Sequence, residues 1–169
     1  MEDIVNRVAN SSLITIDLED YYPAGERTVL DIKDWLYEGL ILKEKEFRNT
    51  LKNFDWQQFK NHHIALCCSS EAIIPAWAFL LIQTHLHGIA KTVVFGTLEI
   101  LETVLYTTII ENLDVSVYKD KPVIVKGCSD KAVPQNAYLL LSKKLQGVAR
   151  SIMYGEACSA VPLFKKNKA

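Results

Sequence analysis

The stretch IALCCSSEAIIP, residues 64–75, decides the fold class, because it joins a short strand of the buried type to the start of a helix. Its first four residues form a continuous apolar run, and Pro75 suits the first position of a helix that we expect to reach Leu86. The same pattern occurs twice more along the chain. The further predicted strands are residues 92–95, followed by a helix to about 112, and residues 123–126, followed by a helix over 134–146.

Short apolar strands that alternate with helices indicate right-handed β-α-β units and parallel strands covered on both faces. We therefore predict an α/β protein with three layers and one small, mainly parallel sheet. If its strands are numbered in chain order from residue 64, we favour the order 2-1-3 across the sheet. The order 1-2-3 stays an alternative.

Two segments near the start of the chain alternate as strands do, residues 13–18 and residues 28–32. The sequence YPAG at residues 22–25 lies between them and combines Pro with Gly, which favours a turn. The pattern predicts an antiparallel hairpin, and helical pieces follow it up to Phe59. We expect a single domain over residues 1–169. Its parts are the hairpin and helical segment at 1–60, the β-α-β core at 61–164, and a basic tail at 165–169.

The charge of the chain excludes some partners. The net charge is −1 and the acidic and basic residues are interleaved, whereas nucleic-acid binding leaves a basic excess. The acidic start has no signal-peptide pattern, and the longest apolar stretch, residues 72–82, is too short to span a bilayer. Four cysteines in a domain of this size do not resemble a secreted disulfide framework. We expect a cytoplasmic protein that binds neither nucleic acid nor membranes.

A weak internal repeat involves two of the cysteines. The sequence CSSEAIIPAWAFLL, residues 68–81, resembles CSDKAVPQNAYLL, residues 128–140, with one residue fewer before the proline. Both segments place a cysteine where a strand ends and a proline where a helix begins. Shared strand-loop-helix geometry explains this as well as duplication does.

Three cysteines are predicted to lie at one edge of the sheet. Ligands of open parallel sheets bind beyond the carboxyl ends of the strands, and Cys68 and Cys128 both follow such ends. Cys158 joins them if residues 148–154 form another parallel strand. If the preceding helix continues through Met153, Cys158 lies at the opposite edge. That helix would be about 30 Å long at about 1.5 Å per residue, so we favour the strand.

Three thiolates and one oxygen ligand suit Zn²⁺. The candidate metal ligands are therefore Cys68, Cys128 and Cys158, with Glu71, Asp130, Glu156 or water as the fourth. Acidic residues of the hairpin could also contribute. An open fourth position would allow metal-activated hydrolysis, and a closed one would make the metal structural. The histidines are excluded as ligands, because His62 and His63 begin a strand and His85 and His87 end a helix at the opposite edge.

Two other functions stay open. In a thiol-dependent redox enzyme or carrier, one cysteine, in the first place Cys128, reacts without a metal. In a non-catalytic interaction module, which we expect to be a homodimer, the cysteines only pack. Free cysteine is often buried as a small apolar side chain, and this is the interpretation we give to Cys67.

Several longer segments resemble a known family. They are LITIDLED at residues 13–20, GER at 25–27, DIKDWL at 31–36, KGC at 126–128 and SIMYGE at 151–156. Through them the chain resembles, over essentially its whole length, an uncharacterised bacterial family, mostly from Bacteroidetes, that is catalogued as a domain of unknown function. The resemblance implies a bacterial, cytoplasmic protein and brings no established activity, substrate or cofactor.

Overall fold

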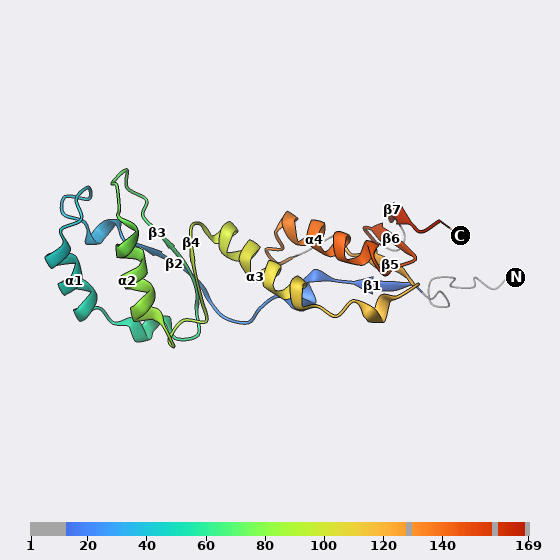
Figure 1. Ribbon diagram of the computed structural model, residues 1–169, viewed down its shortest axis with the longest axis horizontal. Helices are drawn as coiled ribbons and strands as arrows, with labels where there is room; N and C mark the ends of the chain where they lie inside the picture. The colour runs from blue at the N-terminus through green and yellow to red at the C-terminus, as the bar shows by residue number, and fades with distance from the viewer. Residues whose placement is uncertain (1–12, 128–129, 157–158, 168–169) are drawn as a thin grey trace, which may run out of the picture. The chain divides into compact units, whose positions relative to one another are not determined.

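The computed structural model describes residues 13–127, 130–156 and 159–167 (Figure 1). The chain divides into two units, each with its own sheet. Residues 23–104 form one unit, which we call the central unit because it is central in the sequence. Residues 1–22 and 105–169 form the other, which we call the terminal unit.

The central unit contains a sheet of three parallel strands, in which β3 (His63–Cys67) lies between β2 (Arg27–Asp31) and β4 (Thr92–Phe95). Two helices, α1 (Glu44–Asn53) and α2 (Ala76–Leu86), lie beside this sheet (Figure 1). Their apolar side chains pack in one core with those of the strands. Short 3-10 segments at Lys33–Trp35 and Trp56–Phe59 complete the connection from β2 to β3. The core is built around the fully buried Ile64, together with Phe47, Leu51, Ile82 and Leu86.

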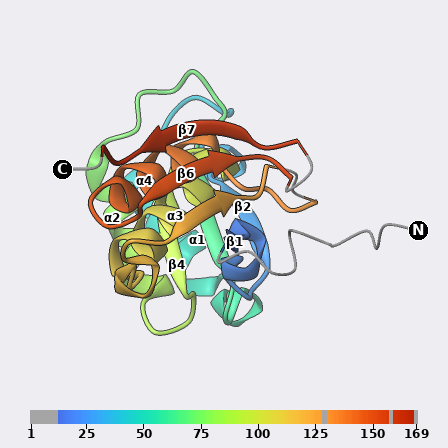
Figure 2. The ribbon, with the colours of Figure 1, turned by 90° about the vertical axis from the view of Figure 1, so that its right-hand side faces the viewer.

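The terminal unit contains four strands in the order β1-β5-β6-β7. The strands β1 (Ile14–Ile16), β5 (Pro122–Val125) and β6 (Ser151–Tyr154) are parallel. The last strand, β7 (Val161–Lys165), lies antiparallel beside β6 (Figure 2). The apolar core of this unit takes side chains from α4 (Gln135–Gln146) and from the second half of α3 (Leu98–Asn112). Short 3-10 segments lie at Leu18–Tyr21 and Ser116–Tyr118.

The two units repeat one β-α-β core, and the repeat aligns without a gap. In this alignment, residue 64 of the central unit corresponds to residue 123 of the terminal unit, and residue 96 corresponds to residue 155. The middle strands then coincide in register, because Leu66 pairs with Phe95 and Val125 pairs with Tyr154. Buried positions match as well: Ala78, Ile82 and Leu86 of α2 fall on Ala137, Leu141 and Leu145 of α4.

The hydrogen bonds of the loops repeat too. Asp55 accepts a hydrogen bond from the Gln57 amide at 3.0 Å, and Asp114 accepts one from the Ser116 amide at 2.8 Å. Asp55 caps the 3-10 segment that leads to β3, and Asp114 lies one residue before the N-cap of the 3-10 segment that leads to β5. Before these strands, Asn61 and Asp120 have φ angles of 66° and 56°, a region that Asn and Asp tolerate better than most residues. Equivalent positions therefore share sequence, burial and backbone conformation.

The α/β class, with its layers of helices on mainly parallel strands, is confirmed. The predicted strand at residues 148–154 is also confirmed, as β6. The strand β7 was not predicted, and it includes Lys165 from the predicted tail. Its Pro162 breaks the strand signal but is tolerated in an edge strand, because proline lacks the backbone donor.

Two parts of the predicted topology are wrong. The first two strands form no hairpin, because β1 pairs with β5 and β2 pairs with β3, in different sheets. The predicted strand order 2-1-3 is also wrong. Its strands 1, 2 and 3 are β3, β4 and β5, and β5 lies in a different sheet from the other two. An apolar strand sequence shows that a segment is buried but does not identify its neighbour. The single domain over residues 1–169 stays a prediction.

Neighbouring leucines of α4 test the core of the terminal unit. Leu141 is fully buried, whereas Leu139 is 69% exposed. We expect Leu141→Ala to lower the free energy of unfolding by about 2–5 kcal/mol, through lost apolar burial and the cavity that it leaves. Leu139→Ala should change it by less than about 0.5 kcal/mol. Chemical denaturation measures both, and equal effects would contradict this account of the core.

Candidate functional site at the carboxyl edge of the terminal sheet

Three parallel strands of the terminal unit end at the same level. Ile16 of β1 lies beside Val125 of β5, and Val125 lies beside Tyr154 of β6. The segments that follow them therefore leave the sheet at one edge, the place where parallel sheets bind ligands. We call this place the carboxyl-edge site and define it by Asp17, Glu19, Lys126, Lys131 and Tyr154.

An ion pair joins the first two segments. Lys126 Nζ lies 2.6 Å from Asp17 Oδ2, and Asp17 Oδ1 accepts a hydrogen bond from the Glu19 amide at 2.9 Å. Burial acts to raise the pKa of Asp17, but the hydrogen bonds from Lys126 and Glu19 outweigh it and hold the pKa below its ordinary value. The hydrogen bond to Asp17 raises the pKa of Lys126 against the opposing effect of burial. Both groups are therefore charged at neutral pH.

A second pair of contacts holds the loop that follows β5. The Lys131 amide donates to Glu19 Oε1 at 2.6 Å, and Lys131 Nζ donates to the Glu19 carbonyl at 3.3 Å. Lys131 Nζ also lies 5.4 Å from the ring centroid of Tyr22, within reach of a cation–π interaction. The segment after β1 therefore fastens both ends of the loop, at Lys126 and at Lys131.

Tyr154 links β6 to the same loop. Its hydroxyl donates to the Gly127 carbonyl at 3.2 Å, and its ring meets the Tyr138 ring edge-on, with 5.7 Å between centroids. A Cβ atom added to Gly127 would lie 3.0 Å from the Tyr154 ring, closer than ordinary contact. Glycine at 127 therefore allows the loop and the tyrosine to approach each other.

Two of the three predicted ligands, Cys128 and Cys158, lie outside the described residues. Their neighbours Asp130 and Glu156 are exposed and belong to the two loops at this edge. Among the described residues, no three His, Cys, Asp or Glu side chains are grouped so that they could hold a metal. The predicted metal site therefore stays a prediction.

Cys68 follows β3, in the sheet of the central unit. The sequence argument for bringing it to Cys128 assumed that both cysteines follow neighbouring strands of one sheet, and this assumption is wrong. In the ungapped alignment of the two repeats, Cys68 aligns with Gly127, and Ser69 aligns with Cys128. The weak repeat aligned the two cysteines only because its alignment was shifted by one residue from the register of the strands.

The equivalent edge of the central unit is built differently. Asp31, the counterpart of Asp17, accepts hydrogen bonds from the Ser69 amide at 3.0 Å and the Lys33 amide at 3.1 Å. The counterpart of Lys126 is Cys67, whose thiol pKa is raised by burial and by the nearby Asp31 carboxylate. Asp31 also lies 3.9 Å from Lys33 Nζ on its own segment, whereas Asp17 pairs at 2.6 Å with Lys126, which follows the neighbouring strand. With the ungapped alignment, the sequence alone would have shown Lys126 as a charged residue at a position where the other repeat has a cysteine.

The histidine at the start of β3 has a structural role. His63 is buried, with Nδ1 3.1 Å from Thr92 Oγ1 and Nε2 3.1 Å from the Ala24 carbonyl. A neutral ring satisfies both contacts by donating from Nε2 and accepting at Nδ1. Burial lowers the pKa of His63; Arg27 and Lys91 lower it further, against the Ala24 carbonyl and Glu102.

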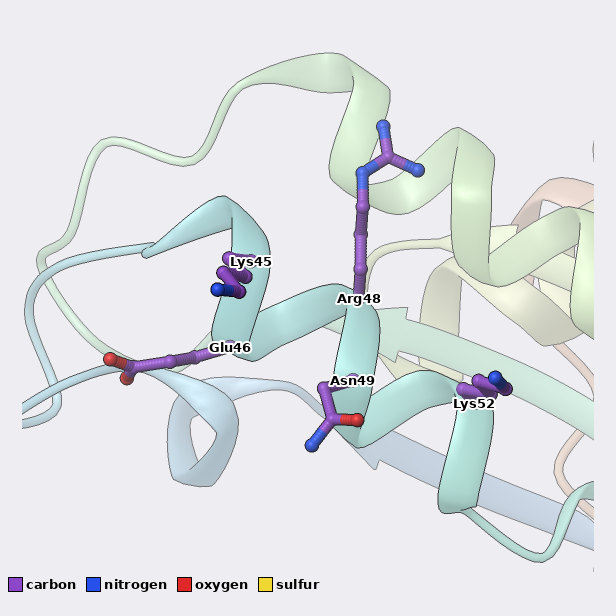
Figure 3. Close-up of a pocket in the computed structure, with 5 residues that line it drawn as sticks. All are labelled: Lys45, Glu46, Arg48, Asn49 and Lys52. Atoms are coloured by element: carbon purple, nitrogen blue, oxygen red, sulfur yellow. The ribbon is translucent and has the colours of Figure 1, made fainter.

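A hollow on α1 does not form a site. It is lined by Lys45, Glu46, Arg48, Asn49 and Lys52, which are all exposed, and their side chains spread in different directions (Figure 3). Arg48 is already engaged by Glu44 at 2.8 Å, within the same helix. We interpret this hollow as the ordinary solvated face of the helix.

The fold of the chain defines an α/β protein with two parallel β-α-β cores and a polar carboxyl edge. The chain belongs to the family described as "Protein of unknown function (DUF2480)", whose model matches residues 2–166. The resemblance to a family of unknown function is thus confirmed. No curated protein and no solved structure matches the chain. Among the described residues, no helix is long and apolar enough to cross a membrane.

His63 predicts how stability depends on pH. The folded state holds its pKa below the ordinary value of about 6.5, so as pH falls through that value the unfolded chain is protonated first. The free energy of unfolding should then fall by up to about 1.4 kcal/mol per pH unit until the folded state also binds the proton. Denaturant titrations between pH 7.5 and 5 measure this slope. His63→Gln should flatten it, and an unchanged slope in that variant would assign the effect to other groups.

Proposed function

We propose that the carboxyl-edge site binds a divalent metal ion, most simply Zn²⁺, through Cys128 and Cys158. The supporting observation is that β5 and β6 are parallel neighbours and that each cysteine follows the carboxyl end of one of them. Neighbouring strands lie about 4.8 Å apart, so the two segments start within a few ångströms of each other.

Two hydrogen bonds fix where these segments start. The Gly155 amide donates to the Val125 carbonyl at 3.0 Å, and the Tyr154 hydroxyl donates to the Gly127 carbonyl. Beyond them, the Ser159 amide donates to the Glu156 carbonyl at 2.9 Å and brings together the two residues that flank positions 157 and 158. The approaches to both cysteines are therefore ordered on the same pair of strands.

The chemistry of the neighbouring groups suits zinc. Thiolates and carboxylates are its usual ligands, and Asp130 or Glu156 would supply the carboxylate. Two thiolates and a carboxylate leave one negative charge in excess of Zn²⁺, and Lys126 is a cation at the same edge. Water in the fourth position would make the ion a candidate for hydrolysis. Cys68, the third predicted ligand, follows β3 in the central unit, and a variant of its own tests whether it binds the metal.

A reactive thiol is the second candidate function. Lys126 and Lys131 lie two residues before and three residues after Cys128, and nearby cations favour the thiolate. In this case the purified protein would contain no metal, and the alkylation rate of Cys128 would report a pKa below the ordinary value of about 8.5. An ordinary thiol pKa would rule out the reactive thiol.

Metal content of the untagged protein, purified without chelator, tests the proposal. We expect about one zinc per chain by elemental mass spectrometry, as a site of this ligand type implies, and its loss in Cys128→Ala and Cys158→Ala. Cys67→Ala is the matched control, because Cys67 lies within β3 and is not a predicted ligand. Cys68→Ala decides between two and three thiolates, since metal is lost in this variant only if Cys68 is a ligand.

Two results would contradict the proposed metal site. One is a wild-type protein that contains no transition metal and takes up none when zinc is added. The other is full metal content in Cys128→Ala, with circular dichroism showing that the variant is folded. Loss of metal in every variant, Cys67→Ala included, would point to unfolding rather than to a site.

A further inference from the structure

The two repeats differ at one edge of their sheets. In the terminal unit, the outer side of β6 pairs with β7. The equivalent strand of the central unit is β4, and it is the last strand of its sheet. Among the described residues, no strand pairs with its outer side. The same fold thus pairs this edge in one unit and leaves it as an edge in the other.

The sequence of β4 lacks the usual protection of an edge strand. It reads Thr-Val-Val-Phe, without charge or proline, although proteins protect exposed edges with such residues to prevent association. The other edge strands are protected in different ways: β7 contains Pro162 and ends at Lys165, β2 begins at Arg27 and ends at Asp31, and β1 is only three residues long. An unprotected edge of this kind is a template for pairing with another strand.

An aromatic pair at the end of β4 shows the same difference. Phe95 meets Phe79 of α2 edge-on, with 4.8 Å between ring centroids, just as Tyr154 meets Tyr138 in the terminal unit. Tyr154 is only partly exposed, and it lies beside Val161 of β7. Within the part of the chain that the structure describes, no strand lies beside Phe95 on its outer side, and its side chain is 65% exposed. An added strand would cover it.

We propose that β4 pairs antiparallel with β4 of a second copy of this chain, which joins two central sheets into one sheet of six strands. A twofold axis makes identical strands antiparallel, which is also the direction in which β7 adds to β6. The twofold axis is normal to the sheet, so opposed residues share a face; in the register that places Val94 at the axis, Val94 faces Val94 of the second copy, and Val93 faces Phe95. These pairs contain no like charges, and β-branched and aromatic residues pair well across strands.

Sedimentation equilibrium of the full chain over a concentration series tests this dimer. The mass should rise from 19.1 kDa towards twice that value as concentration increases. Phe95→Glu should hold the protein at the mass of one chain, because it would bury a charge beside the axis. Phe95 is largely exposed, so this variant should fold, and circular dichroism and thermal melting check that it does. Val94→Lys, at the centre of the strand, should act in the same way.

Leu139→Glu is the matched control, because Leu139 is exposed to a similar degree but lies on α4. It should leave the dimer intact. A wild-type protein that keeps the mass of one chain at its highest soluble concentration would overturn the proposal. So would a dimer that persists in both β4 variants, or one that is lost equally in Leu139→Glu. The result does not depend on metal binding, because β4 belongs to the central unit.

Discussion

Each unit depends on the burial of one middle strand between two parallel neighbours. Ile64 of β3 and Val123 of β5 are fully buried at equivalent positions. A strand in that environment must satisfy every backbone group through its neighbours, because an unpaired amide or carbonyl away from water costs free energy. Its apolar face must also be covered, which α2 and α4 do with the same small and large side chains at matching positions. The loops beyond the carboxyl end are the part of the repeat that is free to change.

These loops show how one backbone serves two kinds of edge. In the central unit, Asp31 accepts hydrogen bonds from backbone amides and lies beside the thiol of Cys67. In the terminal unit, the equivalent carboxylate pairs with Lys126, and Gly127 allows Tyr154 to approach the loop. Lys126 stands where the central unit has the half-buried thiol of Cys67, and it gives the terminal edge a close ion pair that joins the segments after β1 and β5. The metal site that we propose lies at this terminal edge.

The sequence predicts the elements better than their partners. Apolar runs with prolines behind them located β3, β5, α2 and α4, because burial and helix initiation are local properties. The pairing of β1 with β5 is not local: residues 23–104 lie between them, and alternation cannot tell a hairpin from two separate parallel strands. The contact of Asp17 with Lys126 was missed for the same reason. The cysteines were aligned with each other because they share a residue type, whereas the strand register moves that alignment by one residue.

The long stretch of sequence between β1 and β5 also explains why Asp17 and Glu19 bind the loop after β5. Closing a loop as long as the central unit costs conformational entropy, though the cost rises only slowly with loop length. The pairing of a strand of only three residues offsets little of this entropy cost, so further contacts must hold β1 and the residues after it. The Tyr106 hydroxyl donates to the Leu18 carbonyl at 3.0 Å, the Lys126 amide donates to the Ile16 carbonyl at 2.9 Å, and the Asp17 and Glu19 side chains bind the loop after β5. The polar groups at the carboxyl edge therefore hold β1 in its sheet and order the approach to Cys128, so the stability of this strand and the geometry of the site rest on the same bonds.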